Sequence, residues 1–314
     1  MTNQPSLFDE QIITLVDMSP VVYKCQAGPP GENYVNWKWI LLRLLKKIYT
    51  DRTNIFFVLD TRPDRKRSID ATYKADRAKE EAPEVWTALD PLLQWVPQSY
   101  LWAEGEEADD VLAWMALSLP DWEVNILTGD RDLWQLLDNR WIRIWDLRSS
   151  GLVSRKDCQD TFGVKARQIA MYKSWFGDSS DGIPGVPRLH RKKIAPLLIA
   201  PFKKMKESIA WLKSEESKGA MTAKAREALL AFVPRAKTNW KLVKLSKKDF
   251  KSPIKQYSLL GDFDRFMAHV DTTENAQSVG REVFHLAWQN LTACRDTLLD
   301  IAPGDEAPQI GFHK

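Results

Sequence analysis

Acidic residues gather at three places along the chain, with spacings that could bind divalent metal ions. The groups are Glu107, Asp109 and Asp110 in G-E-E-A-D-D; Asp130 and Asp132 in T-G-D-R-D-L; and Asp178 and Asp181 in G-D-S-S-D-G. One or two carboxylates in the first turn of a helix are explained by the helix dipole. Three within four residues repel one another unless a cation lies between them. Because no His or Cys accompanies these groups with ligand spacing, their hard oxygen atoms favour Mg²⁺ or Mn²⁺.

Buried strands are expected to position these groups together with two further aspartates. Residues 11–19 and 54–60 are apolar runs that end near Asp17 and Asp60, and residues 123–129 form a third run before Asp130. A helix is expected between the first two runs, at residues 34–49, which predicts parallel pairing through a right-handed crossover. Functional groups of parallel sheets collect at the carboxyl ends of the strands. A lone aspartate there is commonly a cap or turn residue, but three such ends favour a site.

Further elements follow from local patterns. Helices are expected at residues 83–96, 133–137, 165–176, 203–232 (with a joint at Lys218-Gly219) and 281–300, and between the N-cap Ser154 and Gly163; strands are expected at residues 98–103 and 141–146. The predicted fold class is therefore α/β, with a mostly parallel twisted sheet and flanking helices.

The three motifs E-A-D-D, T-G-D-R-D-L and G-D-S-S-D-G-I-P-G-V-P, in this order, resemble those of the 5′-nuclease family. This family comprises flap endonucleases, phage 5′→3′ exonucleases and the 5′-nuclease domain of bacterial DNA polymerase I. The resemblance covers roughly residues 11–200 well. It implies a PIN-like nuclease domain at 11–176 with a helical arch at 61–82, and a helical DNA-binding lobe with a helix–turn–helix at 177–302. Residues 1–10 and 303–314 are expected to be tails.

The resemblance implies a structure-specific 5′→3′ exonuclease or flap endonuclease that hydrolyses DNA phosphodiester bonds with two or more Mg²⁺ ions, for which Mn²⁺ substitutes. One ion would activate a water, and both would hold the phosphoryl oxygens. The implied first metal cluster is Asp17, Asp60, Glu107 and Asp109; the second is Asp130, Asp132, Asp178 and Asp181. Asp110 is expected to hold a metal-bound water or to cap its helix.

A basic segment at residues 62–79 carries seven basic and three acidic side chains and has little apolar periodicity. Taken alone, this composition is typical of a solvated loop. Tyr73, Lys74 and Arg77 nevertheless resemble the Y-K-x-x-R of the family's arch, which implies base stacking by Tyr73 and phosphate neutralisation by the two cations. Asp64 and Asp70 are expected to be solvated charges.

A second basic region, from Arg188 to Lys206, contains seven Lys or Arg and no acidic residue. Its start resembles the family's helix–turn–helix, which implies that Gly185, Arg188, Arg191, Lys192 and Lys193 contact duplex backbone. The family usually has glycines where Arg188 and His190 stand, so a potassium-type site is expected to be weakened. Residues 235–255, with eight basic residues and one acidic residue, either extend the duplex track or form a solvated surface.

Composition adds few constraints. The chain has 314 residues, a net charge of +3 and three widely spaced cysteines, so it offers neither a disulfide framework nor a zinc motif. The N-terminus lacks the pattern of a signal peptide, and no apolar stretch reaches membrane-spanning length. We therefore expect a cytoplasmic protein. The family resemblance implies that its partner is DNA with a 5′ end, or an RNA primer, and we expect it to be a monomer. A PIN-like single-strand ribonuclease and a non-cleaving DNA-binding scaffold are the alternatives.

Gln4, Leu7 and Phe8 in Q-P-S-L-F resemble the peptide with which bacterial replication proteins dock on the sliding clamp. Leu7 and Phe8 would fill an apolar pocket while Gln4 forms a hydrogen bond at its rim. The alternative is that Leu7 and Phe8 cover the sheet edge beside the first strand.

Overall fold

A computed structural model describes residues 11–25, 34–75 and 84–294 of the chain. The described part is built on one seven-stranded sheet with strand order β6-β5-β4-β1-β2-β3-β7. The strands are β1 (Ile12–Asp17), β2 (Ile55–Val58), β3 (Gln98–Trp102), β4 (Glu123–Thr128), β5 (Ile142–Asp146), β6 (Gly151–Leu152) and β7 (Lys255–Leu259). The five strands from β5 to β3 pair in parallel, and the outer strands β6 and β7 are antiparallel to their neighbours. The predicted mostly parallel α/β sheet is therefore confirmed.

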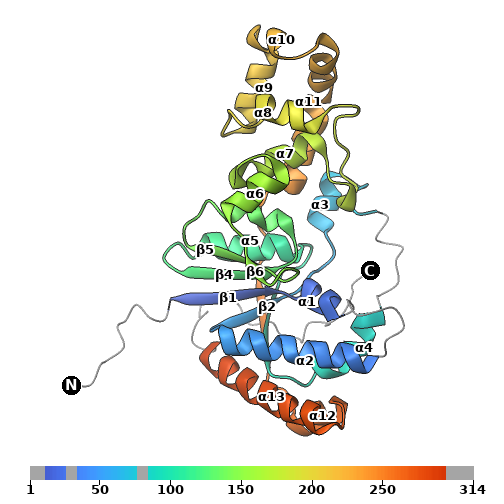
Figure 1. Cartoon of the computed structure of the whole chain (residues 1–314), viewed down its shortest axis with the longest axis vertical. Helices are drawn as coiled ribbons and strands as arrows, with labels where there is room; N and C mark the ends of the chain where they lie inside the picture. The colour runs from blue at the N-terminus through green and yellow to red at the C-terminus, as the bar shows by residue number, and fades with distance from the viewer. Residues whose placement is uncertain (1–10, 26–33, 76–83, 295–314) are drawn as a thin grey trace, which may run out of the picture.

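The central strands are apolar on both sides because each face of the sheet is covered by helices. Along β2, Phe56 and Val58 belong to one buried cluster, whereas Ile55 and Phe57 belong to the other. This alternation follows from the two-residue period of a strand, and burial on both faces explains the continuous apolar sequence. The apolar runs in the sequence thus reflect a three-layer arrangement (Figure 1).

One face of the sheet is covered by helices from both ends of the chain. They are α1 (Met18–Cys25), α2 (Tyr34–Asp51), α4 (Glu84–Leu93), α12 (Phe263–His269) and α13 (Glu274–Cys294). Helix α13 packs along α2 although about 230 residues separate them. The Asn290 side chain also bonds both backbone polar groups of Ile55, at 3.0 and 3.2 Å. Helix α13 is therefore part of the layer that covers this face of the sheet.

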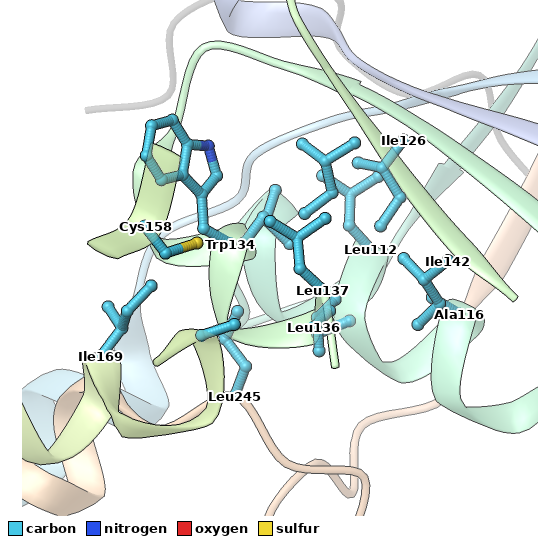
Figure 2. Packing of buried hydrophobic residues seen from close by; sticks show 14 of the residues in the cluster. Leu112, Ala116, Ile126, Trp134, Leu136, Leu137, Ile142, Cys158, Ile169 and Leu245 are labelled. Carbon is cyan, nitrogen blue, oxygen red and sulfur yellow. The ribbon is translucent and has the colours of Figure 1, made fainter. Parts of the chain in front are cut away.

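The opposite face is covered by α5 (Ala108–Ser118), the 3₁₀ helix η2 (Arg131–Leu136) and α6 (Arg155–Phe162). Figure 2 shows Leu112 and Ala116 of α5 packed with Ile126, Ile142 and the side chains of η2. Helix α6 begins at Ser154 with a capping box and ends at Gly163 in the left-handed conformation, as predicted. The segment expected as an α-helix at 133–137 is instead η2, which starts two residues earlier.

A tier of helices continues from this face, as Figure 1 shows. It contains η3 (Ala166–Gln168), α7 (Ile169–Phe176), η4 (Ser179–Asp181), α8 (Arg191–Leu198), α9 (Met205–Lys213), α10 (Glu216–Ala220) and α11 (Ala223–Val243). The joint expected around Lys218-Gly219 is displaced: both residues lie inside α10, and the helices are interrupted on either side of it, at residues 214–215 and 221–222.

The region expected as one helical lobe at 177–302 divides between two parts of the fold: α8 to α11 belong to the tier, whereas β7 belongs to the sheet and α12 and α13 belong to the helical layer over its other face. Strand β7 returns to the sheet and pairs with β3 along its full length, from Lys255 beside Trp102 to Leu259 beside Gln98. The lobe prediction missed this because the segment K-Q-Y-S-L is half-buried and follows a basic stretch, so its pattern is weak.

Among the described residues, no helix is long and apolar enough to cross a membrane.

Candidate active site

The carboxyl ends of adjacent parallel strands bring the predicted aspartates into one cleft. Asp17 ends β1 and pairs in register with Val58, two residues before Asp60, while Asp130 follows β4 on the other side of β1. The cleft has a volume of about 1240 Å³. Its lining includes Asp17, Asp60, Lys74, Glu107, Asp109, Asp130, Lys173, Asp178 and Arg191. The lining thus combines acidic and basic side chains.

Asp17 is the most enclosed of the strand-end carboxylates, with 5% of its surface exposed. Its Oδ2 accepts a hydrogen bond of 2.7 Å from the Thr128 hydroxyl on β4. Burial and the neighbouring charges of Asp60 and Asp130 raise the pKa of Asp17 well above its usual value of 3.8. The folded protein therefore carries an electrostatic cost at this position, which a cation would relieve.

Three groups of carboxylates offer ligand atoms within 4.8 Å of one another: Glu107, Asp109 and Asp110; Asp109, Asp130 and Asp132; and Asp132, Asp178 and Asp181. Clustered carboxylate oxygens of this kind suit a hard divalent cation. The structure thus brings predicted residues together, but it arranges them in three groups of three rather than in two clusters of four. Among the described residues, Asp17 and Asp60 belong to none of these groups, and Asp109 and Asp132 are each shared between two.

Asp60 is fixed beside the first group although it is not part of it. Its two oxygens accept hydrogen bonds from the Ser19 hydroxyl at 2.6 Å and from the backbone of Ala108 at 2.9 Å. The second contact places Asp60 at the first turn of α5, where the helix dipole favours negative charge. Asp60 therefore links the end of β2 to the carboxylates of α5.

Asp110 is a buried residue of the first turn of α5 that forms two ion pairs, and its expected role in holding a metal-bound water or capping the helix stays a prediction. Its Oδ1 lies 2.9 Å from Arg65 and its Oδ2 lies 2.8 Å from Lys66. Burial and the charge of Asp109 outweigh these cations and raise the pKa of Asp110 to about 7. Asp110 thus sits behind the cleft rather than on its surface.

Lys74 lines the cleft and has a strained backbone conformation. Its φ of 49° is in the left-handed region, and its amide donates to the Asp181 carbonyl at 3.1 Å. The ammonium forms ion pairs with Glu107 and, at 3.4 Å, with Asp181. Burial opposes the charge, but the attraction of Glu107 and Asp181 outweighs it and raises the pKa of Lys74. Lys74 therefore remains a cation.

Tyr73 does not occupy the position that base stacking requires. Only 3% of it is exposed, and its ring packs with Ile183, Leu242 and Val243. Its hydroxyl donates to Glu107 Oε2 at 2.7 Å. The structure therefore makes Tyr73 a support for Glu107. Arg77, the third residue of the arch motif, lies outside the described residues, as do Gln4, Leu7 and Phe8.

Sequence reasoning missed three buried charged residues, Lys66, Glu106 and Lys173. Glu106 is 1% exposed and binds Arg65 through both oxygens, at 2.8 and 2.7 Å. Lys173 forms ion pairs with Asp132 and, at 2.6 Å, with Asp178. Only their positions in the sequence could have indicated these residues. Lys66 lies in the basic segment at residues 62–79, and Lys173 lies on the helix that precedes Asp178.

The predicted duplex-contacting residues surround a tight turn between α7 and α8. A Cβ on Gly185 would lie 2.1 Å from the Phe176 carbonyl oxygen, so only glycine allows this approach. A cavity of about 410 Å³ lies here, lined in part by Gly185, Arg191 and Arg235. The side chains of Arg191, Lys192 and Lys193 are exposed.

Arg188 shows the expected departure from glycine. Its φ of 58° is in the left-handed region that glycine adopts without strain. The turn therefore keeps a glycine-like backbone while it carries a cationic side chain.

Several known proteins are similar in sequence to this chain. Residues 13–163 match the sequence family described as the 5′-3′ exonuclease N-terminal resolvase-like domain. The chain is 32% identical to thermostable DNA polymerase I of Thermus aquaticus over 208 residues, which is 64% of this chain and 24% of the polymerase. It is 34% identical to a 5′-3′ exonuclease of Streptomyces coelicolor over 157 residues, which is 44% of this chain and 52% of that protein.

Solved structures share the fold at low sequence identity. The T5 5′-exonuclease, solved with bound zinc ions, has a TM-score of 0.59 and 16% identity, and covers 88% of this chain and 99% of its own. The catalytic core of Rad2 in complex with DNA has a TM-score of 0.52 and 13% identity, with 90% and 95% covered. Residues 13–163 thus match the family of the 5′-3′ exonuclease N-terminal resolvase-like domain, and the chain shares the fold of T5 5′-exonuclease.

Proposed function

We propose that this protein is a metal-dependent 5′-nuclease that hydrolyses phosphodiester bonds near 5′ ends or junctions of DNA. The observation that supports this most strongly is the cleft itself, where carboxylates from the ends of β1, β2 and β4 face Lys74 and Arg191. The sequence match spans only part of each relative. It covers 24% of the length of the Thermus polymerase and 52% of the length of the Streptomyces exonuclease. Substrate and activity are therefore inferred from the site.

The carboxylates would hold Mg²⁺ or Mn²⁺, because all three groups present oxygen ligands and no His or Cys. Asp109 and Asp132, which are shared between groups, would connect neighbouring ions. When bound, divalent ions supply activation of the attacking water and neutralisation of the phosphoryl oxygens. Asp17 would also be stabilised by ions nearby, since burial already disfavours its charge.

The cationic side chains would hold the DNA. Lys74 is anchored between Glu107 and Asp181, so its ammonium lies beside the carboxylate groups and would neutralise charge that develops on the reacting phosphate. Arg191, Lys192 and Lys193 are exposed at the start of α8, about one helix turn apart at most, and would neutralise duplex phosphates away from the reaction. The chain would recognise backbone and the free 5′ end rather than sequence.

Cleavage of 5′-labelled substrates tests this proposal. A flap, a nicked duplex, a blunt duplex and a single-stranded RNA of matching sequence would be incubated with the protein and Mg²⁺, and with EDTA as the control. We expect Mg²⁺-dependent products from the flap or nicked DNA. Cleavage of the RNA alone would indicate the single-strand ribonuclease, and binding without cleavage would indicate the scaffold.

A further inference from the structure

Lys66 lies among three carboxylates of the candidate metal site. It belongs to the short helix α3 (Asp64–Ile69), and 4% of its side chain is exposed. Its ammonium is 2.7 Å from Glu107 Oε2, 2.8 Å from Asp110 Oδ2 and 3.3 Å from Asp109 Oδ2. These are the same carboxylates that form one of the three groups with ligand atoms within 4.8 Å.

The position of Lys66 is fixed from both sides. The preceding residue, Arg65, binds Glu106 and Asp110, and the Thr61 hydroxyl donates to the backbone of Glu106 at 2.7 Å. On the other side, the ammonium lies 5.7 Å from the centre of the Tyr73 ring. These contacts hold α3 against the start of α5, so the ammonium is directed at the carboxylates by the local fold.

Lys66 differs from the other two lysines of the site. Lys74 contacts Glu107 and Asp181, and Lys173 contacts Asp132 and Asp178. Each of these two lysines therefore pairs with two carboxylates, but neither contacts all three carboxylates of a potential ligand group. Within the described residues, only Lys66 contacts all three members of a potential ligand group.

An ammonium and a divalent ion at this place would compete for the same oxygens and repel each other. Two like charges this close repel each other strongly even when they are partly solvated. We propose that Lys66 is a resident counter-cation that holds Glu107, Asp109 and Asp110 together and lowers their affinity for divalent ions. This inference rests on the proposed function. Divalent ions then bind first at the groups built on Asp130 and Asp132.

Mn²⁺ binding to the full-length protein without DNA tests this inference, with free Mn²⁺ followed by electron paramagnetic resonance. Lys66→Met and Lys66→Gln remove the charge, Lys66→Arg keeps it, and Lys213→Met is a control on an exposed residue of α9. We expect both neutral variants to bind Mn²⁺ at least about tenfold more tightly than the wild type. Lys66→Arg and Lys213→Met should match the wild type.

The outcomes separate this inference from the function on which it rests. If the wild type binds no Mn²⁺, the proposed function itself fails. If the wild type binds Mn²⁺ and the neutral variants bind it equally, or if Lys66→Arg shifts affinity as much as Lys66→Met, the counter-cation role is refuted.

The neutral variants should also melt at lower temperature without metal and gain more from Mn²⁺ than the wild type does, because the ion replaces the lost charge. Neutral variants that fold only when Mn²⁺ is present would support the inference in the same way. Variants that stay unfolded with Mn²⁺ would show instead that the ammonium is a structural group that an ion does not replace.

Discussion

The carboxylate of Asp70 lies 2.6 Å from the guanidinium of Arg235, and this ion pair joins the end of α3 to the middle of α11. Arg235 also donates to Asn239 Oδ1 at 2.9 Å, and the Asn239 amide donates to the carbonyls of Ser174 and Pro184. The segment that carries Tyr73 and Lys74 is thereby connected to the turn that carries Gly185. The interpretation of Asp70 as a solvated charge is wrong, because its side chain is 10% exposed.

Arg235→Met should destabilise the protein by about 1–2 kcal/mol, since it removes the cation beside Asp70 and leaves this carboxylate with only the hydrogen bonds from Thr72. Hydrogen bonds from Thr72 and the charge of Arg235 lower the pKa of Asp70 below its usual 3.8. The lowered pKa means that the stabilisation is present above pH 3.8 and is lost as the pH falls through the folded value. Urea unfolding at neutral and acidic pH measures this.

A double-mutant cycle with Asp70→Asn provides the control for this ion pair. The two substitutions should be less than additive at neutral pH, because either one already breaks the pair. Full additivity would show that Asp70 and Arg235 act independently and that α3 and α11 are not coupled through them.

Asp17→Asn should raise stability while it abolishes cleavage. Burial raises the pKa of Asp17, so the folded state disfavours the charged form, and wild-type stability falls as the pH rises above 3.8. The asparagine variant has no charge to bury at this position. In EDTA its free energy of unfolding should therefore equal that of the wild type in acid and exceed it by about 1–2 kcal/mol at neutral pH. Thermal unfolding across pH measures it. A less stable variant at neutral pH would contradict the electrostatic account of Asp17.

Asp130→Asn and Glu107→Gln should also abolish cleavage, yet leave DNA binding intact or tighter, because a carboxylate cluster repels phosphate. Glu107 carries a further role, since it accepts from Tyr73 and pairs with Lys66 and Lys74. Filter binding and single-turnover cleavage would separate the two effects. Wild-type turnover by both variants would remove these residues from the metal site.

Much of the fold followed from the sequence where the local pattern was strong. The apolar runs before Asp17, Asp60 and Asp130 became parallel strands, and the Ser154 and Gly163 signals bounded α6. Strand β7 was not predictable in this way, because its two half-buried faces show no alternation and its partner β3 is about 150 residues away. Contacts so distant in sequence leave little local trace.

The acidic part of the site was predictable because residue type alone restricts what such a cluster can do. Its basic part was only partly predictable. Lys74 was recognised from a motif, but the burial of Lys66 depends on how α3 docks against α5, and that docking is fixed by Arg65, Glu106 and Thr61 together. A run of charges in sequence does not show which member faces inward.

Residues 4–8 lie outside the described part of the chain, and their sequence supports a separate prediction. A peptide of residues 1–10 should bind a bacterial sliding clamp, since Pro5 pre-extends the segment and Leu7 and Phe8 are apolar anchors. Tethering would raise the local concentration of a nuclease at 5′ ends. Titration against a peptide carrying Leu7→Ala and Phe8→Ala measures it. Equal binding by the two peptides, or none by either, would refute docking.

Lys74 and the basic residues at the start of α8 should affect different steps, cleavage and DNA binding respectively. Lys74→Ala should lower the single-turnover rate by about 100-fold or more, because the ammonium lies at the carboxylates where the phosphate would react under the proposed function. Arg191→Ala and Lys192→Ala remove exposed charges at the start of α8, so they should mainly weaken binding and flatten its salt dependence by about one counterion each. Single-turnover rates at saturating enzyme, measured beside binding over a range of salt concentrations, resolve the two effects. Lys213→Met, on exposed α9, is the matched control for loss of a lysine charge. A Lys74→Ala variant with the wild-type rate would show that the ion pairs of Lys74 with Glu107 and Asp181 are structural only.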